Sequence, residues 1–363
     1  MFERKVYLDQ LRVLAIVSII CCHVCCDFII QNNDIFSFFK TFYMLSFFTL
    51  GRFIGIPIFV MISGALLINK SYSLREFVKK RFNRVFVPYI FWALIFSLFS
   101  VVVMHKKFTY ELLLQVFFGQ KGTVGVILWF IWMIMVVYIG IFIINKILEY
   151  GKSKSDKFEN LFVNILVIFS LITYFLSNLG YFPYSSELFY YVQFIPYAIF
   201  GYALTNKDFT NSIITPDFLV VFAFFISVFG YLYFTWTVDI NAISINKFSP
   251  GSYFQFIVMI IVFNIMLFFR YLPESNFNRI NKFLSSNYVS SAILSISRCS
   301  FGIYFIHYLI LKFLQNVYLK QIGLFDHPIF WTPILLIVVF LSSWFIIGIM
   351  AKIPILNKLS GVS

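Results

Sequence analysis

Charged residues are scarce in this sequence. They make up 12% of its 363 residues, whereas 61% are hydrophobic, and a soluble domain carries about 25% charged residues. So few polar side chains cannot cover a surface that faces water, and lipid is therefore the predicted solvent for most of the chain. The scarcity excludes an array of soluble domains and predicts a single membrane domain over residues 1–363.

Cysteines are also few, and four of the five lie in one apolar segment, IICCHVCCD at 19–27. On a helical wheel most of the four point away from His23, and only Cys26 leans toward it. A zinc site needs three or four ligands that converge on one point. We therefore expect no metal and no disulfide framework here, because cysteine in apolar segments acts as a small packing residue.

Acidic residues are fewer than basic ones, 15 against 28, which gives a formal charge of +13. In a soluble protein this excess would suggest a nucleic-acid partner, but in a lipid-embedded chain it predicts cytoplasmic loops rich in Lys and Arg. With the N-terminus inside, 20 of the 28 basic residues fall in cytoplasmic segments. We therefore expect no nucleic-acid partner, both termini in the cytoplasm, and a multi-pass location in the cytoplasmic (inner) cell membrane.

Long apolar runs are abundant. A helix needs about 20 apolar residues to cross the hydrocarbon, and only helices or closed barrels satisfy every backbone group there. The alternation of a barrel is absent, so the sequence predicts an all-α bundle of about ten transmembrane helices. The predicted spans are 11–31, 47–69, 84–104, 125–145, 161–179, 187–205, 216–236, 252–270, 299–319 and 329–351. The first lacks a signal-peptide cleavage pattern and is predicted to be retained, and the polar stretch 271–298 is long enough for a short interfacial helix.

The first predicted helix carries a stripe of ionisable residues. Asp9, Arg12, His23 and Asp27 share one face of the wheel. Ionisable groups inside a membrane are costly, so they indicate a functional site by default. Asp9 and Arg12 can pair at the cytoplasmic interface, and Asp27, one turn beyond His23, can orient its ring. The alternative for His23 is an interhelical hydrogen bond, and the wheel alone leaves both interpretations open.

The segment YLDQLRVLAIVSIICCH, in which ten residues separate Arg12 from His23, resembles the opening helix of the acyltransferase family 3 membrane proteins. These bacterial and eukaryotic enzymes move acyl groups, commonly acetyl, from a coenzyme A thioester onto sugars and other hydroxyl acceptors. The family takes the histidine of this spacing as catalytic. The resemblance therefore implies a catalytic role for His23 and acetyl-CoA, or another acyl-CoA, as co-substrate.

The stretch GRFIGIPIFVMISGALLI at 51–68 is similar to the second helix of the family. Ser63 and Gly64 permit close helix approach and interhelical hydrogen bonding. Ser63 has two interpretations, a packing residue or an acyl-bearing nucleophile that contacts the substrate, and packing is the one we favour.

The stretch KKRFNRVFVPYIFW at 79–92 carries four basic residues where a loop enters the third predicted span. They are Lys79, Lys80, Arg81 and Arg84. Arginine binds phosphate oxygens through bidentate contacts, which suits the pyrophosphate and 3′-phosphate of coenzyme A. The alternative is attraction to anionic lipid headgroups. The family shows Arg-x-x-Arg followed by Pro and Trp, matched here by Pro88 and Trp92, which favours donor binding.

Three further stretches agree in order with the family. LWFIWMIMVVY at 128–138 resembles its fourth helix, and Trp129 there is either part of an aromatic belt or a platform on which a sugar acceptor stacks. SRCSFGIYFIHYLIL at 297–311 resembles its ninth helix, with Tyr304 and His307 one turn apart; for His307 we expect a structural or acceptor-binding role. FIPYAIFGYAL at 194–204 fits more weakly.

The resemblance implies O-acylation, most simply O-acetylation, of a cell-surface polysaccharide or its lipid-linked precursor. The acyl-CoA is expected at an inner mouth formed by Asp9, Arg12 and the four basic residues of 79–84, with His23 as the base that removes the acceptor proton. An acyl-His23 intermediate is the alternative. Many relatives fuse a soluble esterase-like domain behind the last helix, and the sequence stops at Ser363 without one. We therefore expect either that the membrane domain completes the transfer or that a separate transferase or polysaccharide-synthesis protein does. Membrane lipids are the other expected partners.

Two other classes of protein share this general pattern. A transporter or flippase for a surface glycolipid or oligosaccharide also has about ten helices with charged stripes, but it tends to show interrupted helices at matching places in two halves, which the sequence does not. A polytopic glycosyltransferase often places acidic residues in its first outer loop, where this chain offers only Asp34.

Overall fold

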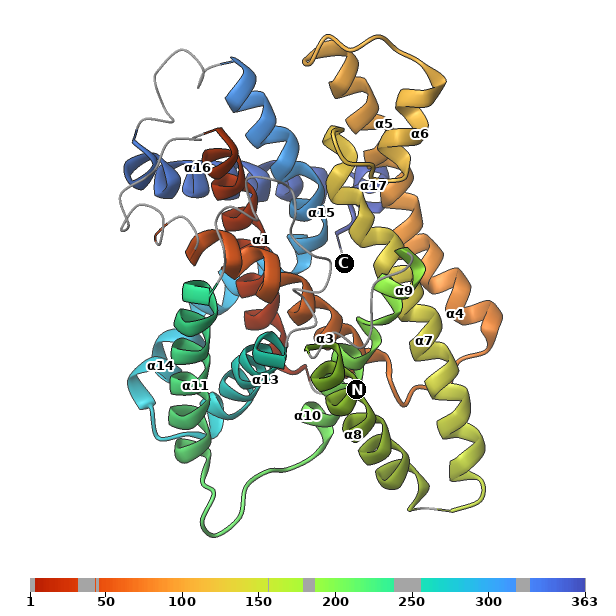
Figure 1. Cartoon of the computed structure of the whole chain (residues 1–363), viewed down its shortest axis with the longest axis vertical. Coiled ribbons are helices and arrows are strands. Elements are labelled where there is room, and N and C mark those ends of the chain that lie inside the picture. The colour runs from red at the N-terminus through yellow and green to blue at the C-terminus, as the bar shows by residue number, and fades with distance from the viewer. Residues whose placement is uncertain are drawn as a thin grey trace. The chain divides into compact units, whose positions relative to one another are not determined.

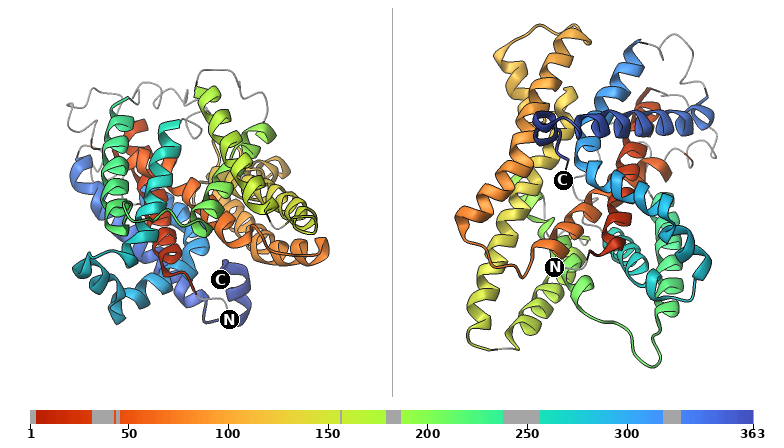
Figure 2. Two further views of the ribbon diagram at one scale, coloured as in Figure 1. Left: turned by 90° about the horizontal axis from the view of Figure 1, so that it is seen from below. Right: turned by 180° about the vertical axis from the view of Figure 1, so that it is seen from behind.

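The computed structural model describes residues 4–31, 43, 46–155, 157–178, 187–237, 256–317 and 327–362. Every regular element in these residues is a helix, and none of them is a strand (Figure 1). The two further views in Figure 2 show the same helices from below and from behind. The all-α prediction is confirmed, and the reason is that a helix satisfies its own backbone in lipid.

Nine helical segments of the described chain are long and apolar enough to cross a membrane. They are Val6–Cys26, Ser46–Leu67, Leu74–Val102, Val124–Lys152, Phe158–Leu176, Pro216–Thr237, Phe256–Glu274, Asn287–Val317 and Ile329–Met350. Each overlaps one predicted span, so the multi-pass membrane architecture is confirmed.

The predicted span 187–205 differs, because it consists of two short helices, α9 (Glu187–Val192) and α10 (Ile195–Asn206). The turn between them is closed by a backbone hydrogen bond of 3.2 Å from Phe194 to Tyr191. Pro196 lies in the first turn of α10, where its missing N–H costs nothing. The same residue inside a continuous helix would remove a hydrogen bond, which explains why the apolar run breaks here.

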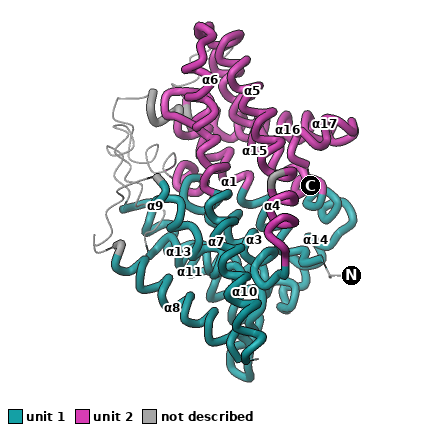
Figure 3. Tube along the Cα trace, turned by 90° about the vertical axis from the view of Figure 1, so that its right-hand side faces the viewer, with its two compact units in different colours: residues 1–15, 52–71, 134–294 teal, residues 16–51, 72–133, 295–363 magenta. Residues whose placement is uncertain are grey.

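The chain divides into two compact units, each packed mainly on itself and coloured separately in Figure 3. Unit 1 holds residues 1–15, 52–71 and 134–294, and unit 2 holds residues 16–51, 72–133 and 295–363. Three long helices have residues in both units: α1 (Val6–Gln31), α7 (Trp129–Lys152) and α15 (Asn287–Val317). The single-domain organisation stays a prediction.

Unit 1 is built around two tightly packed helix pairs, α3 with α10 and α11 with α13. Its elements beside the shared helices are α3 (Ile56–Leu67), α8 (Phe158–Asn178), α9, α10, α11 (Pro216–Thr237), α13 (Phe256–Tyr271), η5 (Leu272–Glu274) and α14 (Asn278–Ser285). Helix α14 is the short helix expected in 271–298. Gly64 of α3 lies against the backbone of Ala198, and Gly201 of α10 lies against the backbone of Met61. This reciprocal contact of small residues lets the two helix backbones touch, as it does in many membrane bundles.

A polar network fixes the end of α3 in unit 1. Asn145 of α7 donates to the Leu67 carbonyl at 2.8 Å and accepts the backbone N–H of Asn69 at 2.7 Å. Asn69 has φ +63°, a left-handed conformation that asparagine tolerates. Lys152 binds the Asn69 side chain at 2.6 Å and Glu159 of α8 at 2.5 Å. The carbonyl of Leu67, the last residue of α3, thereby gains a partner that the helix itself cannot supply.

Unit 2 holds the histidine half of α1 and the C-terminal helices. Its other elements are α4 (Leu74–Arg81), η2 (Phe82–Phe86), α5 (Val87–Val102), α6 (Tyr110–Phe117), η3 (Val124–Leu128), α16 (Pro328–Met350) and α17 (Pro354–Ser360), and η1 (Leu50–Gly55) begins here and continues into unit 1. Gly51 of η1 packs on α1, where an added Cβ would lie 1.8 Å from the Ser18 carbonyl oxygen and 2.4 Å from the Cys22 Cβ. The cysteine here does act as a small packing residue one position before His23.

Candidate functional site

His23 lies on the part of α1 that belongs to unit 2. Its side chain is partly exposed, whereas its neighbours Cys22 and Val24 are buried. The ring centroid of His23 lies 5.3 Å from that of His307 and 5.1 Å from that of Tyr308, both on α15. The structure thus brings together two histidines that are far apart in the sequence, one partly exposed and one fully buried.

His307 is fully buried, with 0% of its side chain exposed. Its Nδ1 lies 3.0 Å from the carbonyl oxygen of Ile303, one turn earlier in α15. The ring centroid of Tyr304 lies 6.0 Å away, and the Tyr304 hydroxyl donates to the Ile127 carbonyl. The predicted neighbours Tyr304 and His307 therefore face one another, and a hydrogen bond to η3 holds the tyrosine in place.

Packing within unit 2 holds this stretch of α15 in register. Trp92 of α5 stacks on Phe305 with ring centroids 5.7 Å apart and an interplanar angle of 10°, and its indole N–H donates to the Ser360 carbonyl at 3.4 Å. A Cβ on Gly302 would lie 2.7 Å from the same Ser360 oxygen. Trp92, which the family pattern marks, is thus a packing residue that positions the helix bearing His307.

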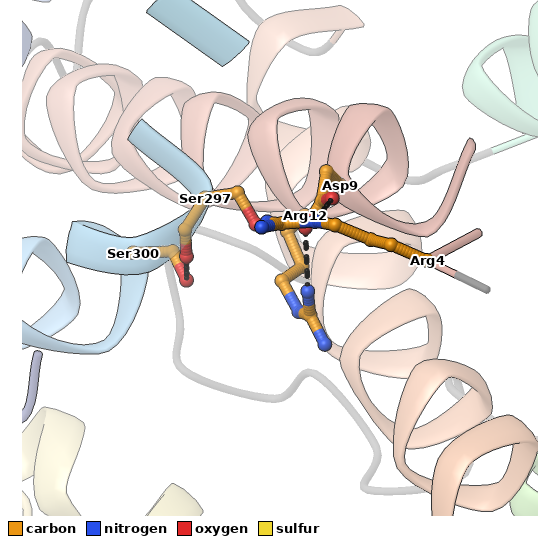
Figure 4. Close-up of polar contacts among 5 residues, drawn as sticks. All are labelled: Arg4, Asp9, Arg12, Ser297 and Ser300. Atoms are coloured by element: carbon orange, nitrogen blue, oxygen red, sulfur yellow. Dashed lines mark hydrogen bonds and ion pairs between the residues drawn. The ribbon is translucent and has the colours of Figure 1, made fainter. Parts of the chain in front are cut away.

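Asp9 and Arg12 form an ion pair in unit 1, as the spacing predicts. Asp9 is 4% exposed. One of its carboxylate oxygens accepts from Arg12 Nη1 at 2.8 Å and the other accepts from Arg4 Nε at 2.7 Å (Figure 4). Both oxygens are engaged with guanidinium groups, so Asp9 is an ion-pair partner that orients Arg12. The Asp9 hydrogen bond raises the pKa of Arg4 above its ordinary value.

The four basic residues of 79–84 lie on one continuous helical segment, where α4 passes through the wider turn η2 into α5. Lys79, Lys80 and Arg84 are exposed and Arg81 is partly buried. The Lys80 ammonium lies 4.8 Å from the Tyr72 ring centroid, and the Arg81 guanidinium lies 5.8 Å from the Phe77 ring centroid. These cation–π contacts position the charged groups of Lys80 and Arg81, and the exposed Lys79 and Arg84 beside them are accessible to an anion.

The remaining predicted site residues fall in three places. Ser63 of α3 donates its hydroxyl to the Phe59 carbonyl at 3.0 Å, a local bond typical of packing serines. Trp129 is the first residue of α7 and is partly exposed. Asp27 lies in α1, and its side chain is outside the described residues. Within the described part of the chain, no three His, Cys, Asp or Glu side chains gather to hold a metal ion.

Residues 5–348 match the family model described as an acyltransferase domain. The chain belongs to acyltransferase family 3. The matched region contains all the candidate residues, from Asp9 to His307. Neither the curated proteins nor the solved structures give a significant match. With its membrane-spanning helices, the chain is a membrane acyltransferase.

Three further basic residues of this acyltransferase, Lys5, Lys70 and Arg270, lie in unit 1 and were not predicted as site residues. Lys5 precedes α1 and donates to the Thr205 carbonyl at 3.4 Å. Its pKa is lowered from the ordinary lysine value, first by partial burial of the ammonium and then by the charges of Arg270 and Lys70. The Arg270 guanidinium is held over the Tyr271 ring at 4.9 Å, and its Nη1 is buried with no hydrogen-bond partner among the described residues.

The sequence held only a weak signal for these three residues. Each lies at the end of a different apolar run, in a segment that the Lys/Arg distribution assigns to the cytoplasm. Which run ends meet depends on helix packing, which the hydropathy pattern does not contain.

We expect that replacing Arg270 with glutamine raises the pKa of Lys5, because one of the two repelling charges is removed. More of the Lys5 amine is then protonated at mildly alkaline pH, so it reacts more slowly with an amine-specific reagent. Mass spectrometry of the N-terminal peptide across a pH series measures this. Arg279→Gln, which removes a charge from α14 instead, should leave the Lys5 profile unchanged, and an equal shift in both variants would contradict a local effect of Arg270.

Proposed function

We propose that this membrane acyltransferase transfers an acetyl or other short acyl group from acyl-CoA to a hydroxyl of a cell-surface polysaccharide or its lipid-linked precursor. The observation that carries the proposal is the partly exposed imidazole of His23, packed against His307 and Tyr308 inside the membrane-spanning part of a family 3 chain. An ionisable group at this depth is costly and is kept for function.

His23 acts as the general base. An unassisted sugar hydroxyl is too weak an acid to attack a thioester at neutral pH, and removal of its proton during attack contributes about 10²- to 10⁴-fold in rate. The hydroxyl oxygen forms a bond to the acyl carbon while its proton passes to His23. The carbon–sulfur bond then breaks, and the thiolate of coenzyme A takes the proton from His23.

Lys79, Lys80, Arg81 and Arg84 bind the phosphate groups of the donor. Support comes from the exposed basic surface of α4 and η2 and from the aromatic rings that position the charged groups of Lys80 and Arg81. Within unit 1, Arg12, oriented by Asp9, is a further cation that can attract an anionic donor. The donor accordingly enters from the cytoplasm.

Replacing Arg81 or Arg84 with alanine should raise the KM for the acyl donor about 10- to 100-fold, because one charge-assisted hydrogen bond to phosphate contributes about 1.5–3 kcal/mol. Turnover at saturating donor should change much less, since neither guanidinium contacts the reacting atoms. Steady-state kinetics of the purified protein over a range of acetyl-CoA concentrations measures both constants.

Arg75→Ala is the matched control, because Arg75 is an exposed arginine of the same helix α4. If Arg81 and Arg84 bind donor phosphate, Arg75→Ala keeps the wild-type KM. If all three alanine variants keep it, lipid-headgroup contact is the better account of the basic residues.

The acceptor is a carbohydrate, for which the partly exposed ring of Trp129 supplies a stacking surface. The enzyme works in the cytoplasmic membrane, alone or with a separate transferase or polysaccharide-synthesis protein. Direct attack by the acceptor and an acyl-His23 intermediate are separated by acid quenching in the absence of acceptor. Label from acetyl-CoA that stays on the protein, and disappears in His23→Ala, would establish the acyl-enzyme route instead of base catalysis.

A further inference from the structure

The protonation of His307 follows from its hydrogen bond. A carbonyl oxygen can only accept, so the Nδ1 that lies 3.0 Å from the Ile303 oxygen must carry the proton. In a neutral imidazole the other nitrogen is then a lone-pair acceptor. This Nε2 is buried and finds no hydrogen-bond partner within the described residues. A buried acceptor left unsatisfied is costly, so it indicates a partner that bonds to it in another state of the site.

The His23 ring is at the right separation to be that partner. An N–H···N bond of about 2.9 Å places the centroids of two imidazoles at most about 5.1 Å apart, when both nitrogens lie on the line between the ring centres. The observed separation is 5.3 Å, with the rings tilted by 40°. Of the rings that contact His307, His23 is the closest; Tyr304 and Tyr308 lie at 6.0 and 6.4 Å. Of these three rings, His23 is the one that carries nitrogen atoms, and a change of its ring rotamer would let one of them approach Nε2.

The tyrosines beside the pair are less suited to the role. The Tyr304 hydroxyl proton is used in its bond to the Ile127 carbonyl. The Tyr308 ring lies under the Lys312 ammonium at 5.2 Å, and that ammonium also donates to Gln315 at 3.2 Å. His307 thus offers His23 a fixed, uncharged acceptor within a shell of aromatic rings.

We propose that His307 is a positioning residue for His23: its Nε2 accepts a hydrogen bond from one imidazole nitrogen of His23 and so leaves the other nitrogen as the base. The inference rests on the proposed function and adds the group that fixes the tautomer of His23. When His23 takes the acceptor proton, the new imidazolium keeps its bond to the neutral His307. The proton then passes from His23 to the thiolate sulfur, and His307 neither gains nor loses a proton.

Three substitutions of His307 separate positioning from packing. Glutamine carries an oxygen near the place of Nε2 and preserves the acceptor, asparagine is too short to reach that place, and phenylalanine fills the volume without an acceptor. We expect His307→Gln to keep turnover within about tenfold of wild type. His307→Asn and His307→Phe should lower kcat about 10²-fold or more, within the range of base catalysis, with the KM for acetyl-CoA changed less than about threefold.

The outcome that overturns the role is equal turnover in His307→Gln and His307→Phe, whether high or low. In the double variant His23→Ala/His307→Phe the two losses should not add, because the second residue acts only through the first; additive losses would contradict the inference. Thermal unfolding in detergent checks that each variant is folded.

A measurement on the wild-type protein tests the inference even where the variants fail to fold. The chain has four histidines, so ¹⁵N-histidine NMR in lipid bilayers resolves few signals, and comparison with His307→Gln identifies those of His307. We expect Nδ1 protonated and Nε2 bare, with an Nε2 shift that changes in His23→Phe because its donor is lost. An Nε2-protonated His307, or an Nε2 signal indifferent to His23→Phe, would overturn the proposal. Neither readout depends on which acyl group or acceptor the enzyme uses. A failure of the proposed function can therefore be distinguished from a failure of the proposed hydrogen bond between His23 and His307.

Discussion

Replacing His23 with alanine should abolish acyl transfer while the protein still inserts in the membrane in normal amount. The change removes the proposed base, and base catalysis is worth about 10²- to 10⁴-fold. It removes little packing, because the His23 side chain is partly exposed and its main ring contacts are with His307 and Tyr308. The measurement is the rate at which membranes that contain each variant consume labelled acetyl-CoA and label the surface polysaccharide.

His327→Ala is the matched control for this substitution. His327 is an exposed histidine at the start of α16, and its side chain makes no capping hydrogen bond. This variant should keep wild-type activity. A well-inserted His23→Ala protein that also keeps it would rule out any catalytic role for His23.

Gly64→Ala should destabilise the protein by about 3 kcal/mol or more, at the upper end of overpacking effects. The added Cβ would lie 1.9 Å from the Ala198 carbonyl oxygen, and backbone cannot give way as a flexible side chain can. Helices α3 and α10 would have to move apart, which removes the close packing that holds membrane helices together. Thermal unfolding in detergent and the yield of monodisperse protein both measure the loss.

The chain offers a control with the same chemical change. Gly348 lies in α16, and a Cβ built there meets nothing within 4 Å. Gly348→Ala should therefore be neutral or slightly stabilising, since alanine favours a helix more than glycine. Equal unfolding temperatures for the two alanine variants would contradict the close α3–α10 contact.

The helical spans were predictable because lipid imposes a strong and local rule. Twenty apolar residues in a row must form a helix, and all nine spanning segments of the described chain overlap predicted windows. One continuous helix was predicted at 187–205, because a count of apolar residues takes no account of where a proline lies within the run. Pro196 was visible in the sequence, but the turn that precedes it depends on how α10 packs against α3.

The candidate site was predictable only in part, for a similar reason. The Asp9–Arg12 pair follows from a spacing of three residues on one helix, and the structure forms it. The contact between His23 and His307 joins two distant helices, so periodicity could not indicate it, and the family motifs named both residues without pairing them. The cation cluster of Lys5, Lys70 and Arg270 likewise needs the packed helices, because each residue alone resembles an ordinary interfacial charge.

The central claim is that this chain takes an acyl group from a coenzyme A thioester and gives it to a hydroxyl. The most direct test is to incubate the purified protein in detergent with acetyl-CoA that carries a radiolabelled acetyl group, with and without a saccharide acceptor. We expect label on the acceptor when it is present, and slow release of labelled acetate when water is the only nucleophile, both dependent on His23. Intact acetyl-CoA in both incubations, from protein that instead moves a glycolipid or oligosaccharide across vesicle membranes, would contradict the account.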